Sequence, residues 1–576
     1  MRAVTATTQG TVERAGASLA YDVYGTASPT ILLVPTWEII HSRAWKMQIG
    51  YLARHFRVIT YDAAGTGRSS RPYDPTRYPP GHRLADAVAI LDATGTNSCV
   101  AVGFSASGAT VLDLAALHPK RVLGVVPIAA STRWRVPSAS RMKSTVYDPV
   151  TNPAPDGWGM FNTEYWKSDW PRFIEFFMSR VNSDPHSTKA WDDCVEWGLE
   201  QEPEVLAYTV TGEADLNDED IKRRLSQLDI PVSLIHGTED QVSDYAASQA
   251  LLDLIPTATL LTVDGASHTP HTRFPVIVNH AILALARRAF STSALPPADL
   301  SYAWHIAPAR PAKALYLSSP IGLGHSRRDL AIAQELRALR PDVQIDWLAQ
   351  DPVTRVLASA GETIHPASAA LAGESAHLVH ESGEHNLAVF QALRTMDEIL
   401  LHNFMVFEEV ANSGQYDLVI ADESWEVDHY LFENPSLKRW SFAWMTDFVG
   451  YLPMPSRGAR EAEVTADYNL EMIEHVARFG RVRDSAVFVG DPDDIVDATF
   501  GPGLPQIRPW TEHNFVFSGY ITGYDPASLG ERAALRKELG YHDDELVCIV
   551  AVGGSGVGVD LLRRVVAGDD AAGQGR

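Results

Sequence analysis

Short apolar runs of strand length recur through the first half of the chain, and stretches with helical periodicity separate them. A run that is apolar throughout is typical of a strand covered on both faces, whereas apolar positions three and four residues apart indicate a helix packed on a sheet. The predicted strands are Leu19–Tyr24, Thr30–Val34, Arg57–Tyr61, Cys99–Val102, Val122–Ile128, Val232–Ile235 and Ala258–Val263. The predicted helices lie at about 44–53, 82–93, 106–116, 245–254 and 276–289. This alternation predicts an α/β fold with a doubly wound, mostly parallel sheet over residues 1–292.

The stretch from about residue 132 to residue 229 breaks this alternation. It reads as helical segments with loops and is rich in tryptophan, at Trp134, Trp158, Trp166, Trp170, Trp191 and Trp197. We interpret it as a cap inserted over the carboxyl edge of the sheet. Its aromatic residues suit a packed core and lid, and they also suit the lining of an apolar acyl pocket.

One strand of this half runs into a tight turn with a central serine. The strand Cys99–Val102 leads into GFSASG at 103–108, and a helical pattern follows. Strand, turn and helix in this order are the context of a nucleophile elbow, with Ser105 as the nucleophile. The sequence departs from the G-x-S-x-G motif at the last position, where Ser107 replaces glycine and Gly108 follows one residue later. We expect the tight turn to form nevertheless, because serine is small. The alternative is that Ser105 only caps the helix.

Residues from about 10 to 290 resemble the α/β-hydrolase superfamily. The resemblance rests on GFSAS at 103–107, YDAAGTGRS at 61–69, HGTED at 236–240 and GASH at 265–268. The order serine, acid, histidine is the order that this family uses. The resemblance implies a serine esterase that acts on carboxylic ester or related acyl bonds by way of an acyl-enzyme, without a cofactor.

A serine nucleophile needs a base that takes its proton during attack. His268 follows the last apolar strand at the same sheet edge as Ser105, so we expect it to be that base. The alternative is that His268 is only a loop histidine and that His271 serves instead.

The imidazole in turn needs a carboxylate that orients it and stabilises its charged form. Asp240 lies just past the strand Val232–Ile235 and is the expected acid. Asp244 and Glu239 are nearby rivals, and Asp240 alone is also compatible with a turn-forming role. We expect His236 to be structural.

The tetrahedral oxyanion of acyl transfer needs preformed N–H donors, each worth about 3 kcal/mol of barrier. We expect these donors to be the backbone N–H of Ala106 and that of Trp37, in the turn after Val34. The resembling family often has His-Gly before an aromatic residue there, whereas this chain has Pro35-Thr36. Proline has no N–H and threonine adopts left-handed geometry only at a cost, so this turn is the weakest part of the resemblance.

A second alternation of strands and helices follows a segment rich in serine, alanine and proline, which predicts a linker at 293–311. A glycine loop at 318–328 is predicted to join the first strand of this half to a helix at 329–339. The predicted strands are Lys313–Leu317, Val343–Leu348, Tyr416–Ile420, Arg439–Trp444 and Val547–Val552. The pattern predicts a Rossmann-like α/β domain over 312–545, followed at 546–576 by the start of another domain and a polar tail that we expect to be disordered.

From about residue 312 the sequence is similar to the two-Rossmann-domain nucleotide-sugar glycosyltransferases, close to the MurG-like and UDP-glycosyltransferase groups. The G-x-G-H-x-x-R loop carries the likeness, with Gly322, Gly324 and His325. The resemblance implies that the acceptor domain comes first and the donor domain second, and that the histidine can act as a base. The alternative for His325 is a loop histidine at a helix start. A donor domain would begin near Leu546, where about 30 residues remain and roughly 150 are needed, so we expect the donor half to be incomplete unless a separate chain supplies it.

The composition narrows the classes of partner. A net charge of −24 over 576 residues argues against a nucleic-acid or anionic-membrane surface. Three cysteines lie far apart and form neither a disulfide framework nor a metal-binding spacing, which suits a reducing cytoplasm. His380 and His385 lack metalloprotease spacing and Gly383 interrupts their helix, so no metal is expected there. We read neither a signal peptide nor a membrane span.

These observations predict a serine hydrolase with a small-molecule ester as its substrate. One alternative is a glycosyltransferase-related protein with an attached hydrolase, whose partner would be a sugar or a glycosylated acceptor. The other is a non-catalytic hydrolase-fold binding module, motivated by Pro35-Thr36 and Ser107. The substrate itself cannot be read, because caps of this kind serve esterases, lactonases, peroxidases and acyltransferases alike.

Overall fold

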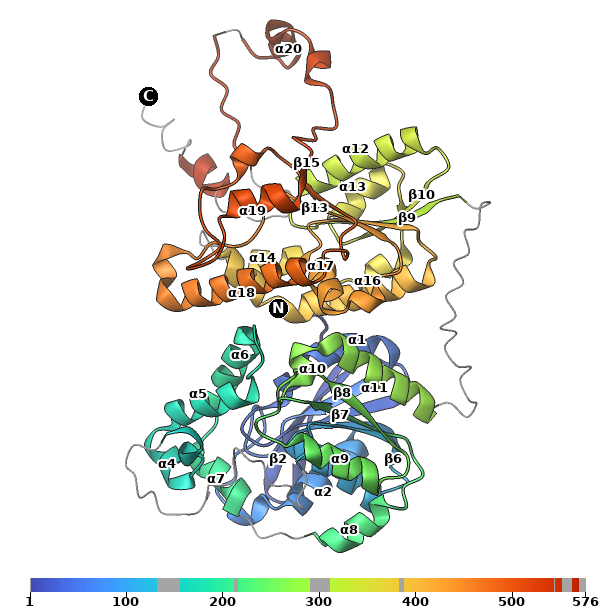
Figure 1. The fold of residues 1–576 in the computed structure, drawn as a ribbon, viewed down its shortest axis with the longest axis vertical. Coiled ribbons are helices and arrows are strands. Elements are labelled where there is room, and N and C mark those ends of the chain that lie inside the picture. Colours follow the sequence, from blue (N-terminus) through green and yellow to red (C-terminus); the bar gives the residue numbers. More distant parts are fainter. Residues whose placement is uncertain are drawn as a thin grey trace. The chain divides into compact units, whose positions relative to one another are not determined.

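The computed structural model describes residues 2–131, 156–211, 216–290, 311–382, 388–542, 544–551 and 562–568. The chain divides into two compact units (Figure 1), one formed by Val4–Ala303 and the other by Trp304–Arg576 with the first three residues. Trp134, residues 132–155 of the predicted cap, and most of the predicted linker fall outside the described residues. Within the described ranges, no helix combines the length and the apolar character needed to cross a bilayer.

An eight-stranded mixed sheet forms the centre of the N-terminal unit, in the order β1-β2-β4-β3-β5-β6-β7-β8. The pairs β1–β2 and β2–β4 are antiparallel, and all pairs from β4 to β8 are parallel. The strands are β1 (Thr8–Arg14), β2 (Ala17–Tyr24), β3 (Thr30–Val34), β4 (Arg57–Tyr61), β5 (Cys99–Phe104), β6 (Val122–Ile128), β7 (Val232–Gly237) and β8 (Ala258–Val263). The sheet confirms the predicted α/β-hydrolase fold class.

Helices cover both faces of this sheet. α1 (Lys46–His55) packs against α11 (Pro275–Phe290), across the strands from α2 (Pro80–Ala93) and α9 (Tyr245–Leu254) (Figure 1). Residues of α2, α3 (Ala106–Leu117), α8 (Asp218–Leu225) and α9 share one hydrophobic core with the strands. α8 falls inside the range predicted as cap, yet it packs on α3 and belongs to this layer.

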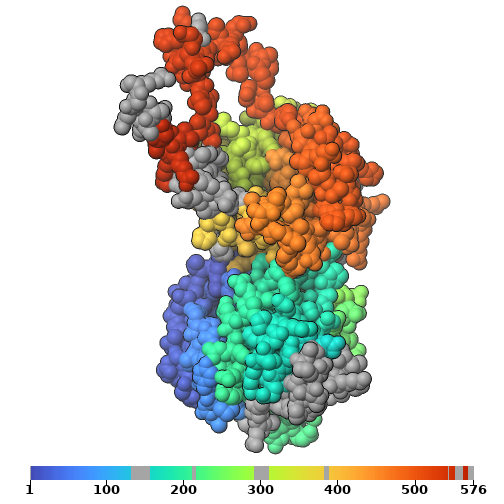
Figure 2. Space-filling view, turned by 90° about the vertical axis from the view of Figure 1, so that its left-hand side faces the viewer, coloured from blue at the N-terminus to red at the C-terminus, as the bar shows by residue number. Residues whose placement is uncertain are grey.

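The cap helices are α4 (Thr163–Ser168), α5 (Trp170–Val181), α6 (Thr188–Leu199) and α7 (Pro203–Thr211). They lie together at one side of the hydrolase sheet in Figure 1, and their atoms, in teal, form much of the face of this unit seen in Figure 2. Their core is aromatic, because Trp166, Phe173 and Phe177 are buried against one another. Ring burial therefore holds the cap together, in agreement with the tryptophan-rich sequence.

The second unit is built on a seven-stranded, all-parallel sheet in the order β11-β10-β9-β12-β13-β14-β15. Its strands are β9 (Lys313–Ser318), β10 (Gln344–Ala349), β11 (Thr363–Ile364), β12 (Leu418–Asp422), β13 (Ser441–Thr446), β14 (Ser485–Phe488) and β15 (Val516–Phe517). Its helices are α12 (Leu323–Leu339), α13 (Val353–Ser359), α14 (Glu374–Ser382), α15 (Val389–Arg394), α16 (Asp397–Ser413), α17 (Trp425–Glu433), α18 (Gly458–Arg478), α19 (Ile507–Asn514) and α20 (Arg532–Glu538). The order reverses between β9 and β12, as in Rossmann-like sheets, and α12 and α13 lie across the strands from α14, α16, α17 and α18 (Figure 1).

Two local predictions for this unit are wrong. The predicted glycine loop at 318–328 is too long, because α12 already begins at Leu323 and places Gly324 and His325 in its first turn. Of the two glycines in this segment, Gly322 has a backbone that favours glycine, with φ +130°, whereas Gly324 lies in the first turn of the helix. The predicted strand Val547–Val552 does not form over 544–551, where Ile549 is 85% exposed and no neighbouring strand pairs with it among the described residues. Val552 and most of the tail lie outside them.

Candidate active site

The turn between β5 and α3 has the geometry of a nucleophile elbow. Ser105 adopts φ 56° and ψ −117°, a strained conformation for a residue with a side chain. A Cβ on Gly103 would lie 2.2 Å from the carbonyl oxygen of Ser107, and one on Gly108 would lie 2.6 Å from the Cβ of Ala130. Both glycines therefore permit the close approach of strand and helix. Ser107, at the position where the motif has glycine, accepts a bond from the Phe104 N–H at 2.8 Å, so its hydroxyl braces the turn.

A chain of hydrogen bonds joins Ser105, His268 and Asp240. The distance from Ser105 Oγ to His268 Nε2 is 2.8 Å, and that from His268 Nδ1 to Asp240 Oδ2 is 2.7 Å. Because an ionised carboxylate only accepts, Nδ1 carries the proton and Nε2 is free to accept from the serine. The structure thus brings together the three side chains that the sequence singles out, from the ends of β5 and β7 and the loop after β8.

The environment of Asp240 keeps its carboxylate ionised. Oδ1 accepts from the backbone N–H groups of Val242 and Ser243 at 2.7 and 2.9 Å. Burial favours the neutral acid, but the charge of His268 and hydrogen bonds from His268 and His236 outweigh it, so the pKa of Asp240 lies below its usual range. An ionised acid is what a developing imidazolium needs beside it.

His236, expected to be structural, contacts the same carboxylate. Its Nε2 lies 3.0 Å from Asp240 Oδ2 and 3.0 Å from the carbonyl oxygen of Ser243, and both partners accept, so Nε2 carries the proton. Its Nδ1 then accepts from the Ser248 hydroxyl at 2.6 Å. This fully buried ring contacts the same oxygen of Asp240 that His268 contacts.

Neither Asp244, a rival for the acid, nor His271, the rival for the base, forms a bond in the chain from Asp240 to Ser105 among the described residues. Asp244 caps α9 by accepting from the Ala246 N–H at 3.0 Å. His271 lies buried against Phe104, with ring centroids 4.3 Å apart. Burial and the neighbouring charge of His268 lower the pKa of His271 to about 3, so it stays neutral. It packs as a neutral, buried ring in this arrangement.

The two backbone groups expected at the oxyanion hole are available as donors. In the described part of the chain, the N–H groups of Trp37 and Ala106 donate to no protein acceptor. The Pro35-Thr36 turn is held to β5, because the Thr36 hydroxyl donates to the carbonyl oxygen of Phe104 at 2.9 Å. The turn is therefore fixed beside the elbow despite the missing N–H of proline.

The Trp37 side chain links this turn to the cap. Its Nε1 donates to the Thr209 hydroxyl of α7 at 2.7 Å. Its ring lies 5.8 Å from that of Phe161 and 5.6 Å from that of Phe177, centroid to centroid. The cap thus covers this turn with an aromatic surface, which suits an apolar substrate group.

In the second unit, His325 lies at the carboxyl end of the sheet. Its Nδ1 is 3.3 Å from Asp422 Oδ2, at the end of β12. Burial lowers the pKa of His325, but its hydrogen bond and charge pairing with Asp422 outweigh this, so the pKa is raised. Arg328, the arginine of the G-x-G-H-x-x-R motif, binds Asp422 with Nε at 2.9 Å and Nη2 at 2.5 Å. Gly322 and Gly324 open the helix that carries both side chains.

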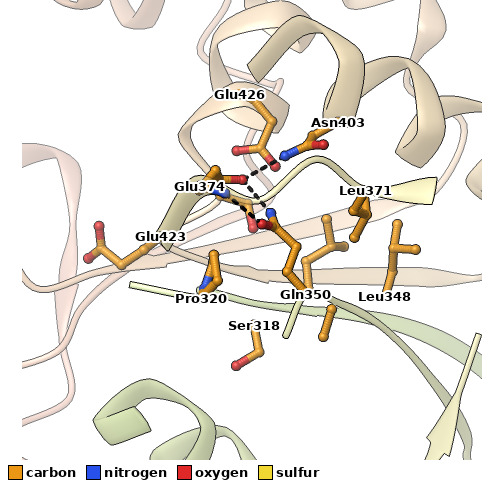
Figure 3. Close-up of a pocket in the computed structure, with 12 residues that line it drawn as sticks. Ser318, Pro320, Leu348, Gln350, Leu371, Glu374, Asn403, Glu423 and Glu426 are labelled. Carbon is orange, nitrogen blue, oxygen red and sulfur yellow. Dashed lines mark hydrogen bonds between the residues drawn. The ribbon is translucent and has the colours of Figure 1, made fainter. Parts of the chain in front are cut away.

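A polar pocket lies beside this group, at the carboxyl ends of β9, β10 and β12 (Figure 3). Glu374 Oε1 accepts from Gln350 Nε2 at 2.5 Å and from Asn403 Nδ2 at 2.8 Å. Burial raises the pKa of Glu374, and burial together with the charges of Asp447 and Asp422 raises the pKa of Glu423 to about 8. The pocket therefore offers amide and carboxyl groups, and the pKa values of two of its carboxyl groups are raised.

Comparison with known proteins concerns the N-terminal unit. A family model described as alpha/beta hydrolase fold matches residues 29–273. The chain is similar to 3-oxoadipate enol-lactonase 2 from Acinetobacter baylyi, at 27% identity over 277 residues, which cover 47% of this chain and 94% of the relative. It is similar to the bifunctional esterase/perhydrolase DCH from Acinetobacter calcoaceticus, at 24% identity over 47% of this chain and 97% of the relative. Among solved structures, the esterase RhEst1 from Rhodococcus sp. ECU1013 is 24% identical, with a TM-score of 0.41, over 48% of this chain and 98% of that chain. The family match ends before the second unit, whose resemblance to glycosyltransferases stays a prediction.

Proposed function

We propose that the N-terminal unit, in which residues 29–273 match the alpha/beta hydrolase fold, is a serine hydrolase of carboxylic ester or related acyl bonds. Ser105 is the nucleophile, His268 the general base and acid, and Asp240 the acid that orients His268. The observation that carries the proposal is the unbroken hydrogen-bond chain from Asp240 through His268 to Ser105, at 2.7 and 2.8 Å.

Acylation begins when Ser105 Oγ attacks the substrate carbonyl carbon and its proton passes to His268 Nε2. The negative charge that develops on the carbonyl oxygen is stabilised by the backbone N–H groups of Ala106 and Trp37. Collapse of the tetrahedral intermediate breaks the ester C–O bond. The leaving alcohol takes the proton from His268 and leaves an acyl group on Ser105.

Deacylation repeats these steps with water as the nucleophile. His268 takes a proton from water, hydroxide adds to the acyl carbon, and Ser105 leaves with the proton returned from His268. Asp240 stays ionised throughout and stabilises the imidazolium twice in each cycle. The substrate class is supported by the relatives named as enol-lactonase and esterase, which act on ester bonds.

A panel of p-nitrophenyl esters of rising chain length tests the proposal. We expect turnover by the wild type that falls by at least about a thousandfold in Ser105→Ala, while Ser226→Ala, which removes an exposed serine of the same unit, leaves it unchanged. Equal activity of wild type and Ser105→Ala would refute the proposal. A folded wild type without turnover on any ester, and without covalent trapping, would instead favour the binding-module hypothesis.

For the second unit we propose, as a separate function, that the pocket of Gln350, Glu374 and Asn403 holds a sugar or a glycosylated acceptor. Its amide and carboxyl groups at the switch point of a parallel sheet support this, because hydroxyl-rich ligands bind through such groups. Saturation-transfer NMR with simple glycosides should give a signal for the wild type that Asn403→Ala loses. Absence of any glycoside signal from the wild type would contradict the proposal.

A further inference from the structure

Two neighbouring helices of the second unit each carry a histidine and a glutamate one turn apart. His429 and Glu433 lie on α17, and Glu471 and His475 lie on α18. Residues four apart share a helix face, and α17 packs against α18. The two pairs therefore meet at the interface between the helices.

The ligand atoms at this interface are close enough to share an ion. One such atom from each of His429, Glu433 and Glu471 lies within 4.8 Å of the other two. His429 Nε2 is 3.7 Å from Glu433 Oε1. Two ligand atoms bound at about 2.1 Å to a tetrahedral zinc lie about 3.4 Å apart, so the ligand atoms must move closer together when an ion binds. His475 lies alongside, with its ring centroid 5.6 Å from that of His429.

The two glutamates of this cluster are buried. The Glu433 side chain is 4% exposed and Glu471 is 5% exposed. The guanidinium of Arg483, which also lines the adjoining pocket, is paired with Asp428 at 2.7 and 2.6 Å. One imidazole and two carboxylates therefore lie close together at this interface.

We propose that His429, Glu433 and Glu471 bind a divalent first-row transition ion, with Zn²⁺ as the preferred ion and His475 as a neighbouring fourth ligand. Imidazole nitrogen with carboxylate oxygen suits Zn²⁺ rather than Mg²⁺ or Ca²⁺, which take oxygen ligands. A pocket lined by His429, Glu471, His475 and the rings of Trp425 and Tyr468 adjoins the site.

Zinc binding to the full-length, tag-free chain tests the proposal. After treatment with a chelator and dialysis, calorimetric titration with ZnCl₂ should give a binding event of one ion per chain that Glu471→Gln and His429→Gln each weaken by at least about tenfold. His513→Gln, which removes an exposed histidine on α19 of the same unit, should leave this event unchanged. Circular dichroism checks that each variant is folded. Should Glu471→Gln fail to fold, His429→Gln carries the test, because the His429 side chain is 28% exposed.

Two further titrations separate this site from a nonspecific acidic surface. Co²⁺ should produce visible d–d absorption in the wild type that His429→Gln alters, because an imidazole nitrogen is bound. Mg²⁺ and Ca²⁺ should bind far more weakly than Zn²⁺. The proposal is overturned if no one-to-one zinc event occurs, if both variants bind zinc as the wild type does, or if Ca²⁺ binds as tightly as Zn²⁺.

Discussion

Replacing the Asp240 carboxylate with the amide of asparagine removes the charge that faces His268 and keeps the size of the side chain. In the wild type, an imidazolium on His268 would lie 2.7 Å from this carboxylate, in a buried site. Two opposite unit charges at that distance attract by about 6 kcal/mol at an effective dielectric constant of 20. That energy corresponds to about four orders of magnitude in rate. Asp240→Asn should therefore lower kcat on p-nitrophenyl esters by about 10⁴.

The matched control is Asp244→Asn, because Asp244 is the carboxylate four residues on that caps α9. Asparagine caps helices about as well as aspartate, so this change should cost little stability and leave kcat within a few-fold of the wild type. Steady-state kinetics measures kcat for both variants, and circular dichroism checks that each variant is folded. The reasoning is refuted if Asp240→Asn keeps more than about a tenth of the wild-type kcat, or if Asp244→Asn loses as much.

Three other predictions follow from contacts around the same site. His236→Gln should lower kcat by about tenfold with little change in KM, because Asp240 loses the support of a second imidazole; an unchanged kcat in the ester assay would contradict this. His271 is neutral in the folded protein, with a pKa of about 3 against 6.5 in the unfolded chain, so the unfolded state binds more protons below pH 6.5 and stability falls as the pH falls. Between pH 7 and pH 5 the protonation of this group alone should lower the free energy of unfolding by about 2 kcal/mol. The free energy of unfolding measured in urea should therefore depend less on pH for His271→Gln than for the wild type. An equal pH dependence would contradict this prediction. Gly103→Ala should destabilise the protein by about 1–3 kcal/mol, because the new Cβ would lie 2.2 Å from a backbone oxygen. Gly324→Ala should not destabilise it, because the space around Gly324 is open. Equal thermal stability of the two variants would exclude the steric argument.

The strands of the N-terminal unit are predictable because burial on both faces requires continuous apolar runs such as Thr30–Val34 and Val122–Ile128. The same reasoning does not predict β1, because β1 lies at the sheet edge and its residues are exposed or half-buried. The grouping of Ser105, Asp240 and His268 could also be foreseen, because the carboxyl ends of parallel strands share one edge of a sheet.

What the sequence does not show is how side chains from different elements meet. In the sequence, His236 cannot be told from other buried strand residues. Its contact with Asp240 depends on the turn after β7, which brings the Asp240 carboxylate back to the His236 ring. His429 and Glu433 have the spacing of a metal-binding pair, yet their partner Glu471 comes from a helix 38 residues further on, and its packing is a tertiary property. Local patterns of this kind become informative only once the neighbouring element is known.

The measurement that tests the account most directly is covalent trapping of the nucleophile. A fluorophosphonate probe should attach one label per chain, and peptide mass mapping should place it on Ser105. Labelling should vanish in Ser105→Ala and become slow in His268→Gln, because the base that activates the hydroxyl is lost. An unlabelled wild type, or a label that persists in Ser105→Ala, would contradict the claim that this serine and this histidine work together.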